Sequence, residues 1–151
     1  MLKWPFMRDF VVTSPFGERI HPVTGEKGSH RGTDYATPVG TPIYSPLTGI
    51  VSLVGEDARA GKFVGVKNKD FYVSFSHLSQ VVAQKGEVVT TGQVLGLTGA
   101  TGMVTGPHVH VVVRDSQGKR IDPETVLDAT NGIESDDGGW VLALATIGAL
   151  L

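Results

Sequence analysis

The stretch from Gly102 to Val113 reads G-M-V-T-G-P-H-V-H-V-V-V, and it places two histidines two residues apart in a run of valines. β-Branched residues favour strands, and a strand sends side chains i and i+2 to the same face. We therefore predict that His108 and His110 project together from one face, while the valines among them point to the other. Two imidazoles on a rigid strand suit a metal site or an acid–base site, but taken alone they fit two surface histidines equally well.

The composition indicates one domain of ordinary size. The chain has 151 residues, of which 40% are hydrophobic and 19% are charged. These values are typical of a globular chain that is long enough to bury a core. The formal net charge is −2 and there is no basic run, so we expect neither nucleic acid nor an anionic membrane surface as a partner. The absence of cysteine excludes disulfides, thiolate metal sites and a cysteine nucleophile.

Turn signals divide the chain into short strands. The 20 glycines and 8 prolines punctuate Val- and Thr-rich segments, and only D-P-E-T-V-L-D, which includes Pro123, has the pattern of a short helical turn. This pattern predicts a mostly β fold, a single antiparallel sheet or sandwich with a metal site in a groove. The loops at 14–28 and 98–107 are expected to form the groove walls. We predict a domain over 1–128, a linker over 129–139 and an apolar tail over 140–151.

A second histidine motif lies earlier in the chain. The segment S-H-R-G-T-D-Y-A at 29–36 gives His30, Gly32 and Asp34 an even spacing, which places them on one face of an extended chain. Gly32 has no side chain and would leave room for a ligand held by its neighbours. Two of the five histidines together with Asp34 would complete a catalytic zinc site, with water as the fourth ligand. Two further histidines could then act as general base and as transition-state donor.

These residues resemble a known family. The segments S-P-F-G-E-R-I-H-P-V-T-G, H-R-G-T-D, F-S-H-L and T-G-P-H-V-H occur in the order found in lysostaphin-type zinc metallopeptidases, which cleave peptide bonds in bacterial peptidoglycan. The resemblance runs from about Val12 to Asp122. It implies the lysostaphin-type fold, which is related to duplicated hybrid motif barrels, and one zinc ion per chain. It also implies the peptide part of bacterial peptidoglycan as the substrate.

The resemblance assigns a role to each histidine by position. It implies that zinc is bound by His30, Asp34 and His110. It implies that His108 is the catalytic base and that His77 is the second catalytic histidine, which holds the water or stabilises the oxyanion. Ser76 replaces the Gly or Ala that often precedes this histidine. Substrate contacts are expected from the following residues: His21, Tyr35 and Thr105.

The chain ends suggest how such an enzyme would reach the cell wall. The N-terminal sequence M-L-K-W-P-F-M-R-D-F does not resemble a secretory signal peptide. The apolar run at 140–151 is shorter than the roughly 20 residues of a transmembrane helix, so we expect no transmembrane helix and a packed or docking segment instead. We expect delivery in a phage particle, as a tail component that binds other tail proteins through this run and acts in the host periplasm or wall. The alternative is a phage lysis enzyme that stays in the host cytoplasm until a holin releases it.

Three other functions compete with this interpretation. A non-catalytic relative could activate other wall hydrolases, although here every expected site position is filled. A biotinyl or lipoyl carrier has a similar hairpin, but the turn at 90–92 lacks the required lysine. The chain could also be a structural part of a virion with an incidental site, which a zinc assay would test.

Overall fold

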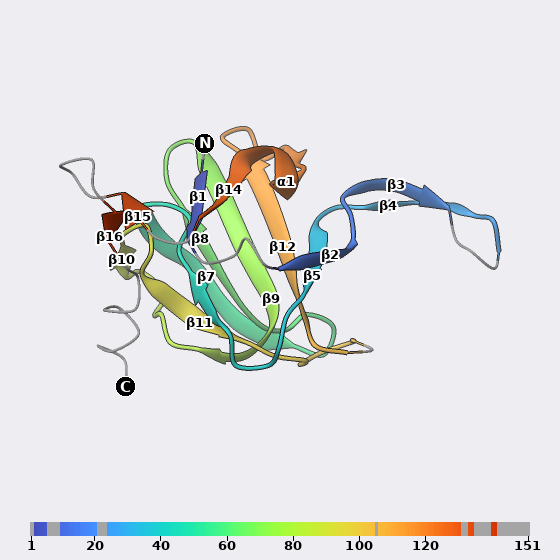
Figure 1. Ribbon diagram of the computed structural model, residues 1–151, viewed down its shortest axis with the longest axis horizontal. Helices are drawn as coiled ribbons and strands as arrows, with labels where there is room; N and C mark the ends of the chain where they lie inside the picture. The colour runs from blue at the N-terminus through green and yellow to red at the C-terminus, as the bar shows by residue number, and fades with distance from the viewer. Residues whose placement is uncertain are drawn as a thin grey trace.

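Antiparallel pairing of short strands builds almost the whole fold (Figure 1). The computed structural model describes residues 2–5, 10–20, 24–104, 106–130, 133–134 and 140–141. The elements are β1 (Leu2–Pro5), β2 (Val11–Ser14), β3 (Gly17–Ile20), β4 (Lys27–His30), β5 (Thr33–Ala36), β6 (Pro42–Tyr44), β7 (Gly49–Asp57), β8 (Gly61–Lys67), β9 (Phe71–Val81), β10 (Val88–Val89), β11 (Val94–Thr98), β12 (His108–Asp115), β13 (Arg120–Ile121), α1 (Pro123–Val126), β14 (Leu127–Thr130), β15 (Ile133–Glu134) and β16 (Trp140–Val141).

The main sheet has ten strands, and its longest members lie at its centre. Seven of them follow the order β10-β7-β8-β9-β12-β5-β2, while β11 pairs with β9 and β6, and β13 pairs with β12. Every strand pair in this sheet is antiparallel. The prediction of a mostly β, antiparallel domain is therefore confirmed.

One face of the central strands supplies the core. Val109, Val111 and Val113 of β12 are fully buried, whereas His108 and His110 are only partly buried. This division confirms the alternation that the sequence predicts for the strand. The same hydrophobic cluster includes Phe75 from β9 and Ile43 from β6, so the core joins the sheet to the segment that pairs with β11.

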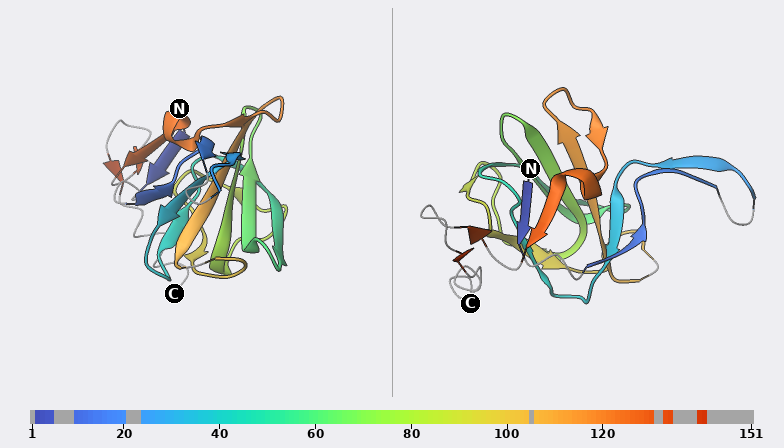
Figure 2. Two further views of the ribbon diagram at one scale, coloured as in Figure 1. Left: turned by 90° about the vertical axis from the view of Figure 1, so that its right-hand side faces the viewer. Right: turned by 45° about the horizontal axis from the view of Figure 1, so that its top comes forward.

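Two peripheral features complete the fold. The β3–β4 hairpin extends away from the sheet, as Figure 1 and the right-hand view of Figure 2 show. The expected short turn at 123–126 is α1, in which Asp122 accepts a hydrogen bond from the backbone of Glu124 at 3.0 Å. None of the described helices is long and apolar enough to cross a membrane.

The expected linker and tail are described only in part. The β14 strand pairs in parallel with β1 and continues to Thr130, two residues into the stretch expected to be a linker. Ile133–Glu134 pairs with Trp140–Val141, which begins the expected tail. The other residues of the tail lie outside the described part of the chain.

An irregularity in β9 determines where His77 points. The residues Val73, Phe75 and Leu78 are all buried, so the regular alternation is broken between 75 and 78. On the neighbouring strand β8, Val64 pairs with Phe75 and Lys62 pairs with Leu78, so two steps along β8 correspond to three steps along β9. The β9 strand therefore has one additional residue at this point. Such a β-bulge re-aims a side chain. At the bulge His77 has φ 67°, and it is the only non-glycine residue with positive φ in the described segments.

This backbone conformation gives a test of the fold at His77. We compare His77→Gly with His77→Ala, since both variants lose the imidazole and its hydrogen bond. Glycine adopts positive φ without a steric penalty, whereas an L side chain there costs about 1–2 kcal/mol. We expect His77→Gly to be more stable than His77→Ala by about 1 kcal/mol, as measured by urea unfolding with a chelator present. In a regular strand alanine would be the more stable of the two, and that order would contradict the bulge.

Candidate metal centre

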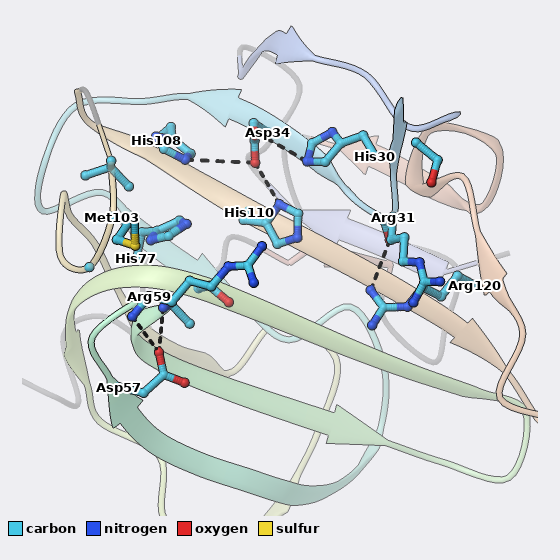
Figure 3. A pocket seen from close by; sticks show the side chains of 15 residues that line it. His30, Arg31, Asp34, Asp57, Arg59, His77, Met103, His108, His110 and Arg120 are labelled. Atoms are coloured by element: carbon cyan, nitrogen blue, oxygen red, sulfur yellow. Dashed lines mark hydrogen bonds and ion pairs between the residues drawn. The ribbon is translucent and has the colours of Figure 1, made fainter. Parts of the chain in front are cut away.

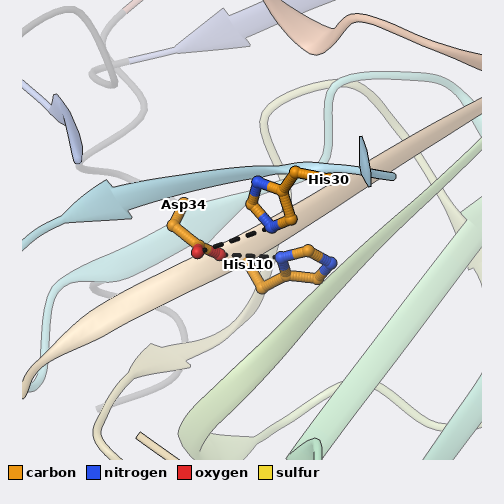
Figure 4. Close-up of side chains that lie close together, drawn as sticks. All are labelled: His30, Asp34 and His110. Atoms are coloured by element: carbon orange, nitrogen blue, oxygen red, sulfur yellow. Dashed lines mark hydrogen bonds and ion pairs between the residues drawn. The ribbon is translucent and has the colours of Figure 1, made fainter. Parts of the chain in front are cut away.

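Three side chains, from β4, β5 and β12, converge at one point (Figure 4). His110 of β12 lies directly opposite Asp34 of β5 in the strand register. Directly opposed residues on paired strands share a face, so the two side chains meet. The His110 Nδ1 atom lies 2.7 Å from Asp34 Oδ1. The His30 Nε2 atom lies 3.5 Å from Asp34 Oδ2, and the metal-binding atoms of the three residues all lie within 4.8 Å of one another.

His30 reaches this point through a bend. It is the last residue of β4, and Arg31 and Gly32 form a bend before β5 begins at Thr33. The prediction that His30 and Asp34 share one continuous extended stretch is therefore wrong in detail, because the chain turns between them. The turn brings the two side chains closer than a straight strand would, since residues i and i+4 of a strand are roughly 13 Å apart.

Gly32 makes room for the site, as the sequence indicates. A Cβ atom at this position would lie 2.8 Å from His110 Cε1 and 2.5 Å from the carbonyl oxygen of Val111. Real Cβ contacts are longer than this, so any side chain here would displace the His110 ring. The space that glycine leaves is occupied by one of the proposed metal-binding side chains itself.

Backbone carbonyl groups orient the other imidazoles. His30 Nδ1 lies 3.1 Å from the Pro15 carbonyl oxygen, His77 Nδ1 lies 2.8 Å from that of Thr101, and His108 Nδ1 lies 3.0 Å from that of Gly106. A carbonyl oxygen can only accept, so in each pair Nδ1 carries the proton. In a neutral ring Nε2 then has the free lone pair. The three rings are thus prepared to offer Nε2 either to a metal ion or to a proton.

His77 and His108 stand together beside the triad (Figure 3). Their ring centroids are 4.8 Å apart, and those of His77 and His110 are 6.4 Å apart. His108 Nε2 lies 3.9 Å from Asp34 Oδ1. The bulge in β9 and the regular alternation of β12 therefore bring two additional histidines to the same groove.

The electrostatics keep Asp34 charged and His77 neutral. Burial alone would raise the pKa of Asp34, but the hydrogen bond from His110 and the nearby imidazoles together hold that pKa below its ordinary value of 3.8. Burial lowers the pKa of His77 below 6.5, and the neighbouring His108 and His110 lower it further. A charged carboxylate is what a cationic metal requires, and a neutral imidazole is what a proton acceptor requires.

The five residues line an open groove with a volume of about 1060 Å³. One wall is the β7–β8 turn, where Asp57 accepts hydrogen bonds from the backbone of Arg59 and Ala60. The loop with Gly102 packs on this turn so closely that a Cβ atom there would lie 2.4 Å from the nitrogen of Gly61. The groove is also lined by Met103, which is 75% exposed.

The expected substrate contacts have different outcomes. Tyr35 is 2% exposed and its hydroxyl donates to Glu124, so it packs in the core and does not line the groove. This corrects the sequence expectation, and the reason is alternation: Tyr35 follows Asp34 in β5 and therefore points to the opposite face. His21 and Thr105 lie outside the described residues, and their expected roles stay predictions.

Sequence analysis missed three arginines that line the groove: Arg31, Arg59 and Arg120. Arg31 lies inside the H-R-G-T-D motif and could have been singled out there. Arg59 belongs to the β7–β8 turn and Arg120 to the two-residue strand β13, both without any recognisable motif, so their proximity follows only from the folded sheet.

The donor set fits zinc. Two imidazole nitrogens and one carboxylate oxygen form a known three-ligand set for catalytic zinc, which leaves a fourth position for water. A tetrahedral ion with bonds of about 2.0–2.1 Å holds its ligand atoms roughly 3.3 Å apart. The separations of 2.7 and 3.5 Å from the Asp34 oxygens lie on either side of this value, and zinc would displace the proton that His110 Nδ1 donates to Asp34. The hydrogen bond from His30 Nδ1 to a backbone carbonyl is the outer contact that usually orients a zinc-bound histidine.

Comparison with known proteins agrees with this geometry. Residues 28–123 match the family model described as Peptidase family M23. The peptidoglycan DD-endopeptidase ShyA of Vibrio cholerae is 39% identical over 110 residues, which cover 72% of this chain and 26% of that protein. The chain thus spans about a quarter of the length of this relative.

Solved structures show the same fold. A zinc-containing peptidase from Vibrio cholerae has a TM-score of 0.72 at 38% identity, with 79% of this chain and 37% of that chain covered. A mutant catalytic domain of the prophage-encoded M23 protein EnpA from Enterococcus faecalis has a TM-score of 0.67 at 35% identity, with 79% and 92% covered. The family match, the sequence identity and the candidate zinc ligands agree, and the chain belongs to peptidase family M23, the zinc metallopeptidases that its histidine motifs resemble.

Proposed function

We propose that this chain is a zinc-dependent peptidoglycan endopeptidase that hydrolyses peptide bonds in bacterial cell-wall cross-links. The observation that carries the proposal is the grouping of His30, Asp34 and His110 with two oriented histidines in one open groove. The similarity to a protein named as a peptidoglycan DD-endopeptidase supports the choice of substrate. A groove open to solvent also suits a large polymeric substrate, which could not enter a closed cavity.

The residues divide the chemistry among them. Zinc held by His30, Asp34 and His110 would polarise the scissile carbonyl group and lower the pKa of a nearby water. His108 Nε2 takes the proton from the attacking water, since its Nδ1 is already committed to the Gly106 carbonyl oxygen. His77 acts beside it: its neutral ring can receive this proton from His108, and the resulting imidazolium would donate a hydrogen bond to the oxyanion. A protonated histidine then supplies the proton that the leaving amine needs.

The direct test is digestion of purified sacculi from a Gram-negative and a Gram-positive source, with and without a chelator. We expect chelator-sensitive loss of cross-linked fragments, detected by mass spectrometry of the released peptides. Added zinc should restore the loss after the chelator is removed. A protein that binds zinc but releases no fragments would instead be the non-catalytic relative.

Replacement of Asp34 tests the metal site. Asp34→Asn keeps the shape of the side chain but removes the negative charge that faces His30 and His110. Loss of an outer contact that orients a zinc ligand lowers zinc affinity by roughly 10- to 100-fold. We expect Asp34→Asn, which changes a ligand itself, to lower zinc affinity by more than this. Competition with a chromophoric chelator would measure this change.

Asp57→Asn is the matched control for the metal test. Asp57 lines the same groove but binds only backbone groups of its own turn. The Asp57→Asn variant should retain one zinc ion per chain. Equal loss of zinc in both variants would mean that general groove charge, and not ligation by Asp34, holds the ion.

Replacement of His108 separates catalysis from metal binding. We expect His108→Ala to keep its zinc and to lose about 10²- to 10⁴-fold in kcat, because a general base is removed while the ligands remain. His110→Ala should lose the metal as well as the activity. Zinc content by mass spectrometry and kcat on a soluble cross-linked peptide give the two readouts. Loss of zinc from His108→Ala would identify His108 as a ligand.

The route to the cell wall is a separate proposal. We infer that the chain acts from a phage particle, with a phage lysis enzyme as the alternative. Similarity to a prophage-encoded M23 protein supports a phage setting. Detection of the chain by mass spectrometry in purified particles would support the first route, and detection only in lysates would support the second. Binding of the apolar run at 140–151 to other tail proteins is part of the first route.

A further inference from the structure

Two arginines border the groove beyond His30 and His110 (Figure 3). Arg31 belongs to the bend between β4 and β5, and Arg120 belongs to β13. The Nη1 atom of Arg120 donates to the carbonyl oxygen of Arg31 at 3.3 Å, which keeps the two residues side by side. Both residues line the groove, and both also line a smaller hollow next to it. The two arginines therefore lie at the border between the groove and the smaller hollow, next to His30.

The positive charge of this pair is not balanced nearby. In the described part of the chain, the ion pairs of the groove join Asp34 to histidines, and none reaches Arg31 or Arg120. Glu18 lines the smaller hollow but makes no ion pair with either arginine. Partial burial lowers the pKa of Arg120, and the charges of Arg114 and Arg31 lower it further. A ligand with negative charge would relieve this repulsion.

Arg114 does not face the groove in the way that Arg31 and Arg120 do. It lies opposite Arg120 in the β12–β13 register, but its guanidinium carbon lies 5.3 Å from the centroid of the Tyr72 ring. This stacking position is a common one for arginine. Arg31 and Arg120 are thus the two cations at this end that face the groove.

We propose that Arg31 and Arg120 bind a free carboxylate of the substrate peptide beside the scissile bond. Guanidinium groups match the planar shape of a carboxylate and bind it with two hydrogen bonds. This inference rests on the proposed peptidase function and names its substrate more narrowly. In a direct cross-link to diaminopimelate, the carbon that carries the cross-linking nitrogen also carries a carboxyl group. A glycine bridge has no charged group at that place, so the arginine pair favours the direct cross-link.

The test uses two soluble cross-linked peptides that differ in one group. One carries the free carboxylate next to the scissile nitrogen, and the other carries a primary amide there. We expect the zinc-loaded full chain to cleave the free acid with a kcat/KM that is about 10- to 100-fold higher, the range for one hydrogen bond between charged groups. Arg31→Gln and Arg120→Gln should each reduce this ratio, as measured by chromatography of the products.

Lys119→Gln is the matched control. It removes one positive charge from the neighbouring turn, where Lys119 is exposed and does not line the groove. The acid-to-amide ratio of this variant should stay at the wild-type value. Zinc content and melting temperature of all variants are measured in parallel. Where Arg120→Gln loses zinc or melts early, Arg120→Lys replaces it, since lysine keeps the charge but cannot bind a carboxylate in the same planar way.

The outcomes separate the two proposals. Equal cleavage of both peptides by the wild type would overturn the carboxylate site and leave the peptidase function standing. An unchanged ratio in both arginine variants would do the same. No cleavage of either peptide would overturn the peptidase function, and the carboxylate site with it.

Discussion

The contact between Asp34 and His110 is the constraint on which the site depends. The two residues are directly opposed across β5 and β12, so the backbone ladder of the sheet sets their separation. The strands that hold them are anchored from behind by Val109 and Val111, which are fully buried in the core. A shift of the register by one residue would turn His110 into the core and a valine into the groove. Packing of the hydrophobic face and placement of the metal ligands are therefore one requirement.

The site combines this rigid ladder with local departures from regular structure. The bend at Arg31–Gly32 swings His30 towards Asp34, and the bulge in β9 places His77 beside His108. Both departures have a cost, because the bend excludes a side chain at 32 and the bulge holds a histidine at positive φ. Strain of this kind persists only where the surrounding structure enforces it. At His77 that enforcement comes from hydrogen bonds of its backbone nitrogen to Ala60 and of its ring to Thr101.

Much of this arrangement could be predicted from the sequence, and the parts that could not share a physical cause. The alternation of β12, the short strands and the three candidate zinc ligands follow from residue spacing together with family resemblance. Tyr35 follows Asp34 in the chain, but neighbouring residues of a strand face opposite sides, so Tyr35 packs in the core and not in the groove. The bulge at His77 has no clear local signal, since an inserted residue becomes visible only when β8 and β9 are paired. Arg59 comes from a turn and Arg120 from the short strand β13, and the proximity of both to the site depends on the whole sheet.

The distribution of charge in the groove gives the substrate a direction. At the metal centre the carboxylate of Asp34 faces three imidazoles, and a bound zinc ion would add positive charge there. Beyond His30 the guanidinium groups of Arg31 and Arg120 line the border between the groove and the smaller hollow, and Glu18 lines that hollow without an ion pair to either arginine. Arg59, which also lines the groove, belongs to a different wall, the β7–β8 turn. A peptide with one carboxylate beside its scissile bond would be oriented by the proposed pair of Arg31 and Arg120. In the proposed reaction, orientation of this kind would align the scissile bond with His108 before the reaction begins, which is how remote binding energy contributes to a rate.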